Sequence, residues 1–181
     1  MPSFPKPYAD IVARLRVPAG FLLVAAFAWF SRPAPSALAL GLPVSVLGLV
    51  LRGWAAGCLA KNQQLAAGGP YAYTRNPLYL GTLLVAAGLA IASRSLWLAA
   101  VFAAVFLLVY LPVIQLEEQH LRRLFPAFRD YAASVPALWF RFPGIPGGSG
   151  FRWSLYRKNQ EYQAALGFLL GAAFLIWKAY S

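Results

Sequence analysis

The chain has 181 residues, of which 60% are hydrophobic and only 12% are charged. A soluble domain of this length needs more polar surface, so the composition predicts a single-domain integral membrane protein of the all-α class. One cysteine rules out an intramolecular disulfide, and one histidine argues against a zinc site. The net charge of +11 suits nucleic acid or an anionic membrane surface, and the membrane is favoured because the basic residues lie at the ends of apolar runs.

Five apolar segments follow one another and predict a bundle of about five transmembrane helices. They span residues 17–30, 37–59, 77–92, 96–116 and 164–177. The first, third and fifth fall short of the ~20 residues of a full span, so they extend into polar flanks or thin the bilayer locally. Residues 17–59 thus hold the first two spans, 60–143 a motif region and 151–181 a C-terminal helix, with a flexible glycine-rich linker at 144–150.

The third and fourth segments are joined only by Ser93, Arg94 and Ser95. So short a link predicts an antiparallel helical hairpin. The far ends of this hairpin carry Arg75-Asn76-Pro77 and Glu117-Glu118. We therefore expect two polar clusters, distant in sequence, to lie on the same side of the membrane.

The distribution of basic residues predicts the orientation. With five spans, one face receives 13 of the 16 lysines and arginines, and the other receives Arg32, Arg94 and Lys178. The positive-inside rule makes the first face cytoplasmic. The sequence thus predicts a multi-pass protein whose N-terminus and active site are cytoplasmic and whose C-terminus is external.

The first polar cluster occupies residues 69–81 and combines tyrosines, an arginine and two prolines. Asn76 followed by Pro77 is typical of a helix start, with Asn as the cap. The helix amides and Arg75 together predict a seat for a carboxylate or phosphate, and the rings of Tyr71 and Tyr79 suit a cationic ligand. The alternative is that these residues only anchor the chain at the membrane interface.

The second polar cluster begins directly after a long apolar span. A carboxylate at that depth is costly, which makes Glu117 and Glu118 functional candidates. The alternative is an ordinary helical ion pair, since Glu118 and Arg122 are four residues apart. We expect His120 to be solvated and Pro112 to kink the fourth helix.

Taken together, the motifs resemble the isoprenylcysteine carboxyl methyltransferase and phospholipid methyltransferase group of membrane enzymes. The resemblance rests on GPY at 69–71, RNPLYLG at 75–81, EEQHL at 117–121, FPAFRDY at 125–131 and VP at 135–136. It covers roughly residues 52–136 and leaves out the first two helices and the last. It implies S-adenosyl-L-methionine as the methyl donor and a membrane-embedded lipophilic acceptor, either a small lipid or an isoprenylcysteine-type carboxylate.

The resemblance also implies roles for individual residues. Cofactor-side positions would be Tyr71, Arg75, Tyr79 and Glu117, together with Asn76, which replaces the usual family histidine, and Gln63, which stands where the family often has histidine. Glu118 and Arg122 would face the transferred methyl group or the acceptor, with Glu118 as the base for a hydroxyl or amine acceptor.

Two other functions remain open from the sequence. Membrane reductases that use NADPH on sterol-like lipids resemble this group in their C-terminal half, and a non-enzymatic lipid-binding protein would also be apolar and basic. The residues leave open which acceptor is methylated and which oligomer forms.

Overall fold

The computed structural model describes residues 5–145, 148 and 150–181, and it describes the side chains of the first helix except those at 6, 9, 13 and 15–19. The described chain is helical and contains no strand, which confirms the predicted all-α class. Part of the predicted linker at 144–150 lies outside the described residues. The helices are α1 (Lys6–Phe30), α2 (Pro35–Cys58), α3 (Pro77–Ser93), α4 (Leu96–Val105), α5 (Leu111–Leu124), α6 (Phe128–Ser134), α7 (Trp153–Lys158) and α8 (Tyr162–Tyr180), with a 3-10 turn η1 (Gly69–Ala72) and a π turn η2 (Phe106–Tyr110).

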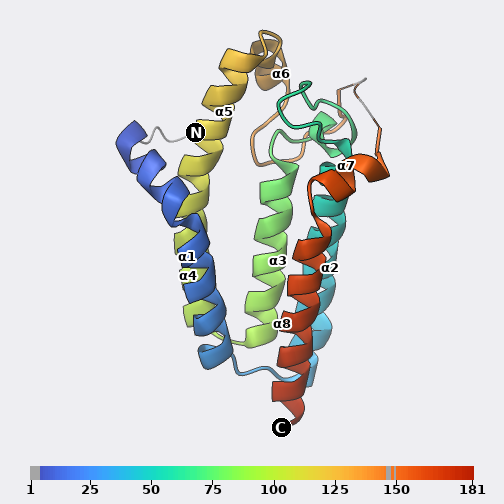
Figure 1. Cartoon of the computed structure of the whole chain (residues 1–181). Coiled ribbons are helices and arrows are strands. Elements are labelled where there is room, and N and C mark those ends of the chain that lie inside the picture. Colours follow the sequence, from blue (N-terminus) through green and yellow to red (C-terminus); the bar gives the residue numbers. More distant parts are fainter. Residues whose placement is uncertain (1–4, 146–147, 149) are drawn as a thin grey trace.

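The long helices run side by side as a bundle (Figure 1). Three helical stretches are long and apolar enough to cross a membrane: α2, the continuous rod from Leu96 to Leu124, and α8. Two shorter apolar helices, Gly20–Phe30 and Pro77–Ser93, lie among them. All five predicted apolar segments are therefore helical, and five membrane crossings stay a prediction.

The predicted hairpin is present, with Arg94 and Ser95 linking α3 to α4. Arg94 adopts the left-handed conformation (φ 51°) as the C-cap of α3, and the Ser95 hydroxyl accepts a hydrogen bond from the Leu98 amide at 3.4 Å. We call this side of the molecule the Arg94 end. It also carries the α1–α2 link, where the Arg32 amide donates to the Ser93 carbonyl at 2.8 Å. The opposite side, with α6, α7 and η1, is the Arg75 end (Figure 1).

Helices α2 and α3 pack very closely, because glycines face each other at two levels. A Cβ atom added to Gly48 would lie 2.6 Å from the Gly81 carbonyl oxygen, and one added to Gly41 would collide with the Gly88 carbonyl. Between these levels the Ser45 hydroxyl donates to the Val85 carbonyl at 3.0 Å. Such close backbone approach through small residues is the usual way that helices associate where the hydrophobic effect is weak.

The rod formed by α4, η2 and α5 contains the proline that we expected to kink it. Pro112 has no N–H, so the Leu108 carbonyl lacks its usual helical donor. The Tyr8 hydroxyl donates to that carbonyl at 2.7 Å, which ties the start of α1 to the rod. The irregularity appears as the π turn just before the proline.

The last part of the chain is fastened to the end of α2. The Asn159 side-chain amide donates to the carbonyls of Ala56 (2.8 Å) and Leu59 (2.9 Å). Glu161 lies four residues after Arg157, at the spacing of a helical ion pair, but its carboxylate binds Arg52 of α2, with an Nη2–Oε2 distance of 3.0 Å. The same guanidinium donates to the Thr82 hydroxyl of α3.

Candidate active site

The hairpin brings the two polar clusters into direct contact at the Arg75 end. The Arg75 guanidinium binds the Glu118 carboxylate in a two-pronged pair, with Nε–Oε1 at 2.9 Å and Nη2–Oε2 at 3.1 Å. This contact confirms that the two clusters lie at the same end of the bundle, and their place on one side of the membrane stays a prediction. The pair joins the start of α3 to α5.

The hydrogen bonds that the Arg75 guanidinium makes within the chain determine what else it can bind. Its third nitrogen donates to the carbonyls of Ala132 (2.8 Å) and Val135 (2.7 Å) at the end of α6. The seat predicted for a ligand's carboxylate or phosphate is thus filled by the chain's own Glu118, which is only 8% exposed. Arg75 acts first as the residue that fixes α3, α5 and α6 relative to one another.

Asn76 occupies the predicted cap position, but its side chain makes no capping hydrogen bond. Its amide instead donates to Glu118 Oε1 at 3.2 Å and to the Ala137 carbonyl at 3.1 Å. The expected capping contact was therefore wrong. The amide competes better for a buried carboxylate, because a charged acceptor forms the stronger hydrogen bond.

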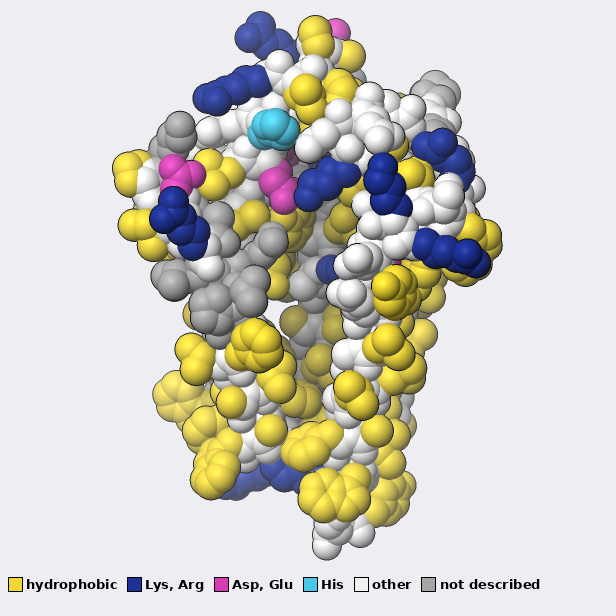
Figure 2. All heavy atoms as spheres, in the orientation of Figure 1, with side chains coloured by type: hydrophobic (Ala, Val, Ile, Leu, Met, Phe, Trp, Pro, Cys, Tyr) yellow, Lys and Arg dark blue, Asp and Glu magenta, His cyan; other side chains and the backbone are white. Residues whose placement is uncertain are grey.

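Beside this ion pair lies a cavity of about 400 Å³, within the range of small-ligand sites. Its walls come from the loop after α2, the start of α3, η1, one face of α5 and α6. Figure 2 shows acidic, basic and histidine side chains grouped at this end of the molecule. The polar and aromatic lining residues are Lys61, Asn62, Gln64, Tyr71, Arg75, Asn76, Tyr79, Glu117, His120, Phe128 and Tyr131.

Glu117 presents an exposed carboxylate to this cavity. The Tyr79 hydroxyl of α3 donates to its Oε1 at 2.8 Å, so this second contact also bridges the hairpin. The Tyr79 ring meets Tyr110 edge to face at 5.9 Å, and Tyr110 stacks on Phe106 at 6.0 Å. An oriented carboxylate beside aromatic rings is suited to a positively charged ligand.

Two buried tyrosines, Tyr71 and Tyr131, line the cavity. Tyr131 of α6 donates its hydroxyl proton to the Tyr71 carbonyl at 2.8 Å. Burial raises the pKa of the Tyr71 phenol, and burial also raises the pKa of Tyr131, against a lowering effect of the nearby Arg75 charge. Both phenols therefore remain protonated at neutral pH and act as neutral groups.

The structure separates the predicted site residues into three sets. Tyr71, Arg75, Asn76, Tyr79 and Glu117 line the cavity. Glu118 lies behind Arg75, with both carboxylate oxygens engaged. Gln63 and Arg122 do not line the cavity; both are exposed, and Arg122 lies over the Phe128 ring at 5.6 Å.

Lys61, Gln64 and His120 line the cavity but were not predicted as site residues. A signal for His120 was present, since Val113, Glu117 and His120 recur at the spacing of one helical face. Lys61 and Gln64 lie in a loop where Asn62 takes a left-handed conformation (φ 60°), and no pattern in the sequence marks that turn.

The phospholipid methyltransferase family model matches residues 37–127, which include the first polar cluster, the hairpin and the start of the second cluster at Glu117 and Glu118. This chain belongs to the phospholipid methyltransferase family. The match confirms the family that the motifs resemble. Among the described residues, no group of three or more His, Cys, Asp or Glu side chains could hold a metal ion.

Two curated relatives carry names from metal resistance. The nickel-cobalt-cadmium resistance protein NccN of Alcaligenes xylosoxydans xylosoxydans is 34% identical over 82% of this chain and 65% of its own length. The cobalt-zinc-cadmium resistance protein CzcN of Cupriavidus metallidurans is 37% identical over 71% of this chain and 56% of its own length. The chain thus spans less than two thirds of either relative. No solved structure matches it.

Proposed function

We propose that the chain transfers a methyl group from S-adenosyl-L-methionine to a lipophilic acceptor at the membrane surface. The observation that carries the proposal is the cavity between α3 and α5, where an oriented carboxylate and aromatic rings meet inside a region that matches a methyltransferase family. The bundle of long apolar helices supports an acceptor that arrives from the bilayer.

The residues around the cavity fit the proposed donor group by group. Glu117 and the rings of Tyr71 and Tyr79 suit its sulfonium and ammonium charges, whereas Lys61 suits its carboxylate. Asn62 and Gln64 offer amides for the hydroxyl groups of its ribose. When bound, the donor would supply a methyl group on a cationic sulfur. An acceptor lone pair would attack the methyl carbon in line, and neutral S-adenosylhomocysteine would leave with the electrons of the C–S bond.

The chain's own part in the reaction is to bind and to orient. The Arg75–Glu118 pair keeps α3 and α5 at a fixed separation, and the Tyr79 hydroxyl fixes the direction of the Glu117 carboxylate. Such positioning lowers the entropic part of the barrier, which is the main requirement of a displacement from a good leaving group.

The nature of the acceptor decides whether a base is needed. An acceptor carboxylate needs none, whereas a hydroxyl or amine must lose a proton. Glu118 was predicted for that task, but its oxygens accept from Arg75 and Asn76. His120 lines the cavity and is exposed, so we assign it the role of base that accepts the proton from such acceptors. The distribution of basic residues supports a cytoplasmic site.

Calorimetry of the purified protein with S-adenosylhomocysteine tests the proposal, with NADPH as the competing ligand. We expect S-adenosylhomocysteine to bind and NADPH not to bind. Glu117→Gln should weaken binding about 10-fold, the loss of one charge-assisted contact. Glu117 is exposed, so this change leaves the fold intact, unlike a change of Arg75.

The matched control is Asp130→Asn, which removes an exposed carboxylate of α6 outside the cavity. It should bind with wild-type affinity. Binding of NADPH in place of S-adenosylhomocysteine would point to a reductase. Equal affinities of the wild type and Glu117→Gln for S-adenosylhomocysteine would show that the donor does not bind in this cavity.

A further inference from the structure

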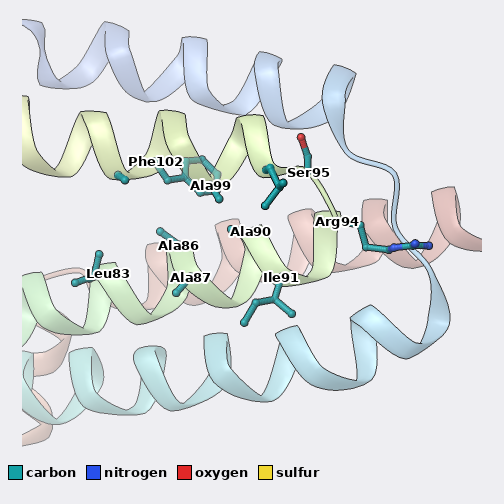
Figure 3. A pocket seen from close by; sticks show the side chains of 11 residues that line it. Leu83, Ala86, Ala87, Ala90, Ile91, Arg94, Ser95, Ala99 and Phe102 are labelled. Atoms are coloured by element: carbon teal, nitrogen blue, oxygen red, sulfur yellow. The ribbon is translucent and has the colours of Figure 1, made fainter.

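A second cavity lies between α3 and α4 at the Arg94 end, far along the hairpin from the candidate active site. Its volume is about 610 Å³. Five alanines leave the space open, and the rest of the wall is formed mainly by Leu83, Ile91, Leu96 and Phe102. Figure 3 shows Ala86, Ala90, Ala99 and Phe102 on the facing sides of the two helices, with Arg94 at the closed end of the hairpin.

The two cavities are distinct, since no residue lines both. The stacked rings of Phe106 and Tyr110, with Tyr79 against Tyr110, lie between their levels on the hairpin. The apolar cavity is therefore separate from the polar one and has its own chemistry. It does not depend on the function proposed for the polar one.

Among the described residues that line the apolar cavity, Arg94 carries the one charged side chain. Arg94 lines the cavity and is exposed, and in Figure 3 its side chain extends away from the helices. Arg32, also exposed, is held close by the hydrogen bond from its amide to the Ser93 carbonyl. All five acidic residues of the chain belong to other places: the start of α1, α5, α6 and the start of α8.

The backbone at Arg94 adds a second, independent observation. The residue is the C-cap of α3 in the left-handed conformation, a position that favours glycine or asparagine. Any residue with a Cβ atom is disfavoured there relative to glycine, so an arginine at this cap points to a task beyond ending the helix. A guanidinium at the end of an apolar cleft between two apolar helices can bind a phosphate with two parallel hydrogen bonds.

We propose that the α3–α4 cleft binds an anionic phospholipid of the bilayer. An acyl chain fills the space between the alanines of the two helices. The headgroup phosphate binds the Arg94 guanidinium, and the charge of Arg32 adds to the attraction. Charge complementarity selects this occupant over a neutral lipid, and the same charge repels the equally basic Arg94 end of a second copy.

Native mass spectrometry of the purified protein tests this inference, with phosphatidylglycerol and phosphatidylcholine of identical acyl chains as probes. One basic residue near the lipid surface is worth about fivefold in affinity, so the wild type should prefer phosphatidylglycerol by at least that factor. Arg94→Gln should bring the ratio close to one. Arg129→Gln, an exposed arginine of α6 at the Arg75 end, should leave the ratio unchanged.

Two further variants separate binding from folding. Arg94→Gly should melt no lower than wild type, because glycine suits the left-handed cap, and should still lose the preference for phosphatidylglycerol. Ala99→Leu fills the cleft and should lose the bound lipid, whereas Ala100→Leu adds the same bulk on the exposed side of α4 and should keep it.

Four results would overturn the inference. The first is equal binding of the two lipids by the wild type, and the second is an equal effect of Arg94→Gln and Arg129→Gln. The third is a dimer in light scattering that Ala99→Leu dissociates, which would show that a second copy covers the cleft. Retention of phosphatidylglycerol by the Ala99→Leu protein would equally exclude the cleft as the site.

Discussion

Helix α3 is packed in opposite ways on its two sides. Toward α2, glycines at two levels bring the backbones into direct contact, and a hydroxyl bridges them. Toward α4, alanines line an open cleft. At the start of α3 this open side is closed by the Arg75–Glu118 pair, which meets the polar cavity.

The difference shows how one helix can serve as scaffold and as wall. A Cβ atom is all that separates glycine from alanine, but it decides whether two backbones touch. The closed side fixes α3 on α2, so that the open side can present cavities at both levels without collapse. Both proposed sites lie on the side where packing is incomplete, as is common for ligand sites between helices.

The largest effect on stability is expected at the Arg75–Glu118 pair, which closes the start of the α3–α4 side. Arg75→Met should lower the free energy of unfolding by about 3–5 kcal/mol, because Glu118 is then a buried charge without its partner. Denaturant unfolding in detergent would measure this. The double variant Arg75→Met/Glu118→Met should regain most of the loss, and a double variant as unstable as the single one would show that the pair is not the cause.

A smaller effect is expected on the closed side. Gly88→Ala should cost about 1–3 kcal/mol, because the added Cβ would lie 2.5 Å from the Ser45 amide nitrogen, and backbone atoms cannot move aside easily. The matched change on the open side is Ala90→Val, which adds bulk next to the cleft. It should stay within about 0.5 kcal/mol of wild type. If the two variants melt alike, the contrast between the two sides is wrong.

The smallest effect concerns the hydroxyl bridge between α2 and α3. Ser45→Ala removes a buried donor and should cost about 1 kcal/mol, the usual net value of such a hydrogen bond. Ser36→Ala, at an exposed position of the same helix, provides the control and should change the melting temperature very little. A Ser45→Ala protein as stable as this control would mean that the glycine contacts alone hold the two helices.

Much of this arrangement could be predicted from the sequence. The short link after Ser93 sufficed to predict the hairpin, and the hairpin sufficed to predict that Arg75 and the two glutamates meet. The division of labour between Glu117 and Glu118 could not be predicted. Neighbouring helical residues point about 100° apart, and the π turn before Pro112 inserts an extra residue that rotates everything after it. The pattern of apolar residues gives no sign of that turn.

The binding partner of Asn76 was hidden for a different reason. Asn before Pro is a good capping sequence, and only the arrival of a buried carboxylate from 42 positions away redirects the amide. The same holds for Glu161, whose partner Arg52 is 109 positions distant. Local sequence rules describe local competition, and both contacts are decided by long-range neighbours.

The tie between Arg52 and Glu161 has a practical consequence for anyone who shortens this protein. The region matched by the family ends at residue 127, which invites truncation before the final helix. Such a fragment would keep a guanidinium inside the bundle and discard the carboxylate that neutralises it. In a fragment that keeps α6 but lacks α8, replacing Arg52 by methionine should raise the yield, so the point at which this protein can be shortened depends on charge balance as well as on the family boundary.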